Sequence, residues 1–158
     1  MLKKLMKNER GLTLIELLAV VVILGIIAAI AIPAIGGMIA NSKADAHIAN
    51  AKQIANSARL YVTTDNITVD TTGTSVDIST LISKGHLEDN IKDPNGTGNA
   101  KYDPTNTKVI IKKTANNNYQ YFVKLQAAAS GQTAGKEYTD QTVSGGKDVN
   151  DLVRTDIK

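Results

Sequence analysis

The chain has 158 residues and contains no cysteine, no tryptophan and a single phenylalanine. The absence of cysteine excludes disulfides, a thiol nucleophile and thiolate ligands for a metal. Because aromatic residues are scarce, a core must be built mainly from isoleucine, valine, leucine and alanine. After a long helix, about 95 residues remain for a globular part, which is enough for one small domain.

Catalytic chemistry is also sparse. Neither a nucleophile elbow nor a phosphate-binding loop occurs in the sequence. His47 and His86 are the only histidines, and neither has a second ligand at metal-binding spacing. We therefore expect both to be solvent-exposed, and we expect no enzyme, no metal site and no cofactor.

Charge is missing from a long stretch near the N-terminus. Between Leu12 and Ile35 there are 24 residues, and Glu16 is the only charged one. A helix needs roughly 20 apolar residues to cross a bilayer, so this run is long enough. A lone carboxylate in lipid costs at least ~2.5 kcal/mol, which marks Glu16 as a functional residue in need of a partner.

The positive formal charge of the chain belongs to its first eleven residues. Four cations and one carboxylate lie there, and the rest of the chain carries 14 cations and 14 carboxylates. Cations ahead of an apolar run keep the N-terminus in the cytoplasm. The remaining neutral chain gives no indication of a nucleic-acid partner.

The sequence Gly11-Leu12-Thr13-Leu14-Ile15-Glu16 resembles the prepilin-peptidase site of type IV pilins and of pseudopilins. In that family the chain is cut after the glycine and the new N-terminus is N-methylated. The resemblance implies cleavage between Gly11 and Leu12, methylation of Leu12, and assembly roles for Glu16, Gly25 and Pro33. Most members carry phenylalanine where this chain has Leu12.

The resemblance also implies a division of the chain and a set of partners. Residues 1–11 would be the leader, 12–40 the transmembrane and polymerisation half of the helix, and 41–158 the globular domain. The partners would be the prepilin peptidase, further copies of the chain in a helical homopolymer, the pilus assembly platform, minor pilins, and the cytoplasmic membrane before assembly. The lack of cysteine points to a Gram-positive or otherwise disulfide-poor source.

We expect a structural subunit of a type IV pilus, of the major kind, displayed on the cell surface for adhesion, motility or DNA uptake. A pseudopilin of a type II secretion or competence system uses the same kind of helix and is the alternative. A membrane-anchored protein of another function is the remote alternative, because a plain anchor has no need of Glu16.

The rest of the sequence predicts an α+β fold of the pilin type, in which a long N-terminal helix packs against a small antiparallel sheet. A helix is expected from residue 13 to about 63, with Pro33 inside it, and its second half carries an apolar stripe at three- and four-residue spacing. That stripe comprises Ala44, Ile48, Ala51, Ala55, Ala58 and Val62.

Shorter elements should follow this helix. The residues from Thr63 to Ser75 predict a loop, residues 78–84 a short helix ended by Gly85, and Asp93-Pro94-Asn95-Gly96 a turn. Alternating residues predict a hairpin of strands 108–113 and 119–126, joined at three asparagines that suit a tight turn. An edge strand is considered for 137–143, and residues 148–157 either close the domain or remain loose.

Overall fold

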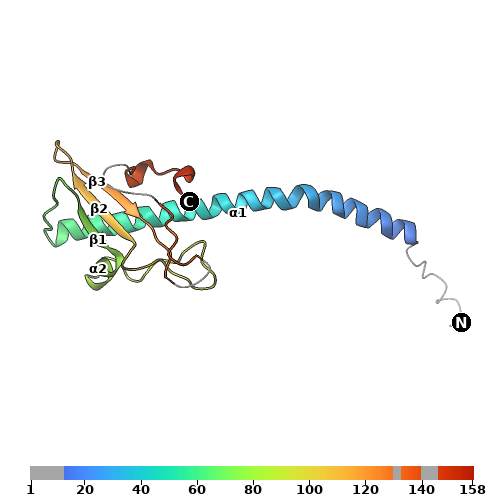
Figure 1. The fold of residues 1–158 in the computed structure, drawn as a ribbon, viewed down its shortest axis with the longest axis horizontal. Helices are drawn as coiled ribbons and strands as arrows, with labels where there is room; N and C mark the ends of the chain where they lie inside the picture. Colours follow the sequence, from blue (N-terminus) through green and yellow to red (C-terminus); the bar gives the residue numbers. More distant parts are fainter. Residues whose placement is uncertain (1–12, 130–132, 140–145) are drawn as a thin grey trace, which may run out of the picture. The chain divides into compact units, whose positions relative to one another are not determined.

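The computed structural model describes residues 13–129, 133–139 and 146–158. It divides into two compact units, which meet in the sequence between Ala40 and Asn41. Figure 1 shows the elements in chain order, and their bounds are α1 Leu14–Thr64, β1 Thr74–Asp77, α2 Ile78–Ser83, β2 Lys108–Lys113, β3 Tyr119–Lys124, and the 3-10 helices η1 Val149–Asp151 and η2 Arg154–Asp156.

Helix α1 is a single α-helix of 51 residues that continues through Pro33, as predicted. Its first turn is closed by a capping box, since the Glu16 carboxylate accepts from the backbone N–H and the hydroxyl of Thr13. The buried side chains of α1 all lie in its second half and recur at three- and four-residue spacing. They are His47, Ala51, Ile54, Ala55, Ala58, Tyr61 and Val62.

The second half of α1 packs against a three-stranded antiparallel sheet with the order β1-β2-β3. The hairpin of β2 and β3 confirms the predicted pair, with Val109 opposite Val123 and Ile111 opposite Tyr121. These four side chains are buried in the same hydrophobic cluster as the apolar residues of α1. The fold is therefore α+β and consistent with the pilin fold.

Strand β1 lies at the end of the stretch that the sequence predicted as loop. Its Val76 pairs with Val109 and is buried, although threonine, serine and aspartate surround it. The last residue of this strand, Asp77, caps α2 by accepting from the backbone N–H of Thr80 at 2.7 Å. Gly85 follows α2 with a φ of +75°, as expected for the residue that ends a helix.

The C-terminal segment closes the free edge of β3 with side chains. Thr139 accepts from the Leu125 N–H at 2.8 Å and donates to the Val123 carbonyl at 2.7 Å. The Asp148 carboxylate accepts from the Tyr121 N–H at 3.0 Å. Instead of a regular edge strand at 137–143, the described part shows isolated bridges of Glu137 to Gln126 and of Thr139 to Ile157, and residues 140–143 lie outside the described residues.

Candidate functional site

The N-terminal half of α1 presents an apolar surface that no described residue of its own unit covers. The large hydrophobic side chains from Leu14 to Ile39 are each at least half exposed, and Leu14 reaches 88%. Within the described residues, this helix is the one long and apolar enough to cross a membrane. An apolar surface of this kind is stable only in lipid or against other apolar helices.

The predicted assembly residues lie at or along this surface. Glu16 occupies the first turn of α1, and its Oε2 atom accepts both bonds from Thr13, at 2.8 Å and 2.9 Å. Pro33 lies inside the helix, and apart from the neighbouring backbone of α1 no described atom comes within 4 Å of a β-carbon built on Gly25. Gly11 and Leu12, the predicted cleavage site, lie outside the described residues.

A second cluster of functional groups is buried in the globular unit, and the sequence did not indicate it. His47 and Tyr138 are fully buried, and Tyr102 and Asp93 are 1% exposed. The Tyr138 hydroxyl donates to Asp93 Oδ2 at 2.6 Å, and the Tyr102 hydroxyl lies 2.6 Å from His47 Nδ1. The cluster joins α1 to two segments far away in the sequence.

The prediction that His47 is solvent-exposed is therefore wrong. The physical reason is that His47 extends the buried face of α1 by one turn, four residues before Ala51 and seven before Ile54. This spacing is the signal in the sequence that indicates burial of His47. His86, also predicted to be exposed, is half-buried, and its Nε2 lies 3.3 Å from Asp65 Oδ1.

Burial determines the acid–base properties of the cluster. Loss of hydration lowers the pKa of His47 to about 4, although the nearby Asp93 carboxylate acts in the opposite direction. Burial also raises the pKa of Tyr102, and it raises that of Tyr138 to about 12, with the hydrogen bond to Asp93 adding to the effect. At neutral pH, histidine and both tyrosines are therefore uncharged.

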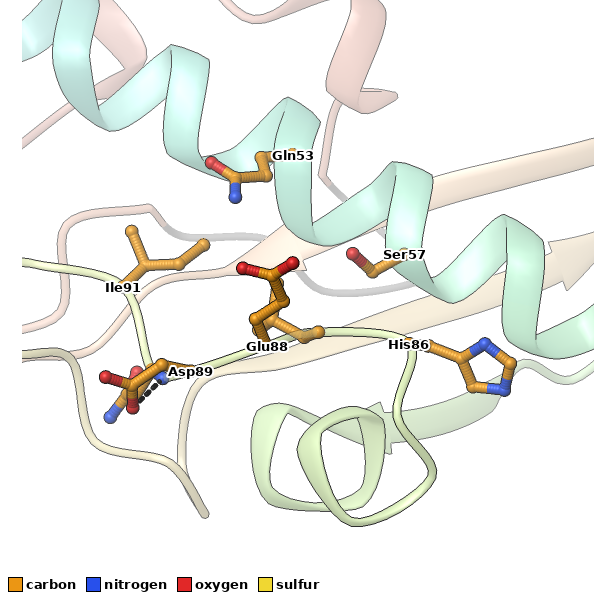
Figure 2. A pocket seen from close by; sticks show the side chains of 8 residues that line it. Gln53, Ser57, His86, Glu88, Asp89 and Ile91 are labelled. Carbon is orange, nitrogen blue, oxygen red and sulfur yellow. Dashed lines mark hydrogen bonds between the residues drawn. The ribbon is translucent and has the colours of Figure 1, made fainter.

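A groove of about 430 Å³ runs between α1 and the segment 86–91 of the same unit. Figure 2 shows Gln53 and Ser57 on the helix side, with His86, Glu88 and Asp89 on the opposite segment. The Asp89 carboxylate accepts from the Asn90 backbone N–H at 2.6 Å. These groups form no nucleophile–base pair, and in the described part of the chain no three acidic or histidine side chains could hold a metal.

Comparison with known proteins identifies the N-terminal segment. Residues 6–32 match the model of the prokaryotic N-terminal methylation motif, so the chain carries the signature of type IV pilins and pseudopilins. No curated protein and no solved structure matches the chain. The motif and the fold together support a pilin-like protein and point to a structural subunit rather than an enzyme.

Proposed function

We propose that the chain is a major subunit of a type IV pilus that polymerises through the first half of α1. The observation that carries this proposal is the exposed apolar half of α1 from Leu14 to Ala40, in which Glu16 is the only charged residue and its carboxylate caps the first turn. In a filament, neighbouring copies of this helix bury each other's apolar surface, at about 25 cal/mol for each Å².

Processing precedes assembly in this proposal. The subunit waits in the cytoplasmic membrane as a single-pass precursor, with the cationic residues 1–11 in the cytoplasm. The prepilin peptidase cuts between Gly11 and Leu12, and the new amine of Leu12 is methylated. Residues 12–40 then form the polymerisation helix, with Gly25 and Pro33 inside it, and residues 41–158 form the globular domain.

Glu16 selects the register of the filament in this mechanism. Its Oε2 atom already accepts from Thr13, and its Oε1 atom takes part in neither of those bonds. We assign Oε1 to the cationic Leu12 amine of a neighbouring subunit. Breaking such a pair away from water costs about 3–5 kcal/mol, so a register that leaves Glu16 unpaired is strongly disfavoured.

A pseudopilin of a secretion or competence system is the second candidate, since the matched motif is the signature of both groups. It shares the cleavage, the methylation and the membrane stage. The two candidates differ in the length of the filament and in the machinery that extends it. Long fibres recovered from the surface of cells that produce the chain favour the pilus.

The role of Glu16 can be tested with Glu16→Ala and Glu16→Gln. We expect both variants to be cleaved and to accumulate in the membrane, but to enter filaments poorly, because the Leu12 amine then has no carboxylate partner. The measurement is the ratio of sheared fibre to membrane-held subunit, with the mature N-terminus determined by mass spectrometry. Glu88→Ala, which removes an exposed carboxylate of the globular unit, is the matched control.

The fibre yield of the Glu16 variants separates a role in assembly from simple anchoring. A plain anchor tolerates the neutral residue or inserts better with it, because a charge has been removed from lipid. Wild-type fibre yield from Glu16→Ala would therefore refute the assembly role. Loss of fibre in Glu88→Ala to the same degree would show that the assay does not report on the helix.

A further inference from the structure

The hydrogen bonds around Tyr102 assign the tautomer of His47. Asn50 Nδ2 donates to the Lys92 carbonyl and to the Tyr102 hydroxyl, both at 3.2 Å. A carbonyl can only accept, so the atom facing Lys92 must be the amide nitrogen. The Tyr102 oxygen therefore accepts from Asn50, and among the described residues the one acceptor within hydrogen-bond distance of its hydroxyl is His47 Nδ1, at 2.6 Å, so we direct the tyrosine hydrogen there.

It follows that His47 is the neutral tautomer with its proton on Nε2. This Nε2 atom is buried and has no hydrogen-bond partner. The nearest carboxylate oxygen, Asp93 Oδ1, is 3.9 Å away, which is too far for a hydrogen bond. A buried donor without an acceptor is costly, so the histidine is held in place by the groups around it.

Asp93 cannot move toward His47 without losing bonds of its own. Its Oδ2 atom accepts from the Tyr138 hydroxyl at 2.6 Å, and its Oδ1 atom accepts from the Asn95 backbone N–H at 2.9 Å. The close contact of Gly96 with Ala100 further restricts this turn, because a β-carbon on Gly96 would lie 2.4 Å from that of Ala100. The carboxylate is therefore fixed at a distance from the imidazole.

Protonation of His47 is incompatible with this arrangement. A proton on Nδ1 turns the acceptor of the Tyr102 hydroxyl into a donor, so the tyrosine hydrogen loses its acceptor. The charged groups around the ring oppose one another: Asp93 favours the imidazolium, whereas Lys43 on α1 and Lys136 before Tyr138 disfavour it. The outcome is dominated by the burial of the ring, which disfavours a cation.

We propose that this cluster is an acid-sensitive clasp that holds segments 91–102 and 133–138 against α1, and that protonation of His47 opens it. The position of the clasp gives the opening a consequence, because His47 is the first buried residue of α1. Opening uncovers α1 from His47 toward Ala51, and so lengthens the part of the helix that is free to contact other molecules. This inference does not depend on the proposed function.

The size of the effect follows from linkage. His47 has a pKa of about 4 in the closed clasp, and a solvated histidine titrates near 6.5. Acid therefore favours the open form as the pH falls below 6.5, and the gain is complete below about pH 4. Relative to neutral pH, the equilibrium constant for opening should rise about twentyfold at pH 5.

The experiment is hydrogen–deuterium exchange of the full-length chain in detergent micelles between pH 7 and pH 4.5, corrected for the intrinsic exchange rate. We expect peptides of segments 91–102 and 133–138 to exchange faster in acid. His47→Gln, which keeps a polar side chain that does not titrate, should remove this dependence. His86→Gln removes the other histidine of the chain and should leave the dependence unchanged.

Asp93→Asn provides an independent test if His47→Gln does not fold. The amide oxygen still accepts from Tyr138, but this hydrogen bond loses its charged acceptor, so the clasp is weaker and its segments should exchange faster at neutral pH. The acid response should persist, because His47 is still present to titrate. The proposal is overturned if wild-type segments show no faster exchange down to pH 4.5. It is also overturned if His47→Gln retains the wild-type response, or if Asp93→Asn, which keeps His47, loses that response.

Discussion

Tyr138→Phe isolates the contribution of a single buried hydrogen bond to the stability of the globular unit. The phenylalanine ring keeps the packing against His47, whose ring centroid lies 4.1 Å away. The substitution removes the hydroxyl that donates to Asp93 at 2.6 Å, and that carboxylate is 1% exposed. A hydrogen bond to a charged group contributes about 1.5–3 kcal/mol, so the free energy of unfolding should fall by about 2 kcal/mol.

This loss can be measured as a thermal shift of the full-length chain in detergent, followed by near-ultraviolet circular dichroism of the tyrosines. For a unit of this size, about 2 kcal/mol corresponds to a decrease in Tm of roughly 6–10 °C. Tyr119→Phe is the matched control, because Tyr119 is 43% exposed at the start of β3. Its Tm should stay within about 2 °C of the wild type.

A double-mutant cycle separates the hydrogen bond from other effects of the substitution. In an Asp93→Asn background the partner of Tyr138 is neutral, so removal of the hydroxyl should cost roughly 1 kcal/mol less than in the wild type. Equal losses in both backgrounds would refute the charge-assisted bond. An unchanged Tm in Tyr138→Phe itself would show that Asp93 is satisfied by other groups.

Two further substitutions test the packing of the globular unit by thermal unfolding. Ala55→Glu places a carboxylate without a partner at a fully buried position between α1 and the sheet, and should lower stability by several kcal/mol, whereas an unchanged Tm would mean that the core face of α1 is misplaced. Gly96→Ala should cost about 1–3 kcal/mol, because its β-carbon would lie 2.4 Å from that of Ala100. Gly37→Ala meets no atom within 4 Å and is its control, so equal losses would contradict the steric argument.

The elements that the sequence predicted well are those with a regular hydrophobic pattern. The helix from 13 to about 63 corresponds to α1, and the expected hairpin corresponds to β2 and β3, with Asn117 at a φ of +63° in the turn. In each of these elements several apolar side chains recur at the period of a helix or of a strand. Strand β1 was missed because Val76 is its only buried residue, and a single apolar residue establishes no period.

The two candidate sites differ in how far the sequence revealed them. The methylation motif is local, so consecutive residues contain the whole signal, and residues 6–32 match it. The clasp instead combines His47, Asp93, Tyr102 and Tyr138, which come together only when the chain folds. Nothing in the sequence links residues 45 or 55 positions apart, as the partners of these bonds are.

The same limit applies to the C-terminal region, where the lack of cysteine leaves packing and hydrogen bonds to hold the chain. The bonds at the edge of β3 come from Thr139 and Asp148, two short polar side chains in a stretch without hydrophobic alternation. Short polar side chains favour local bonds in loops, and that preference predicts only a turn. Here the two residues instead occupy the backbone groups of Tyr121, Val123 and Leu125. Such groups on an open strand invite pairing with another chain. If the chain assembles through its helix as proposed, this closure favours that route, because it removes the backbone groups of β3 as a competing site of association.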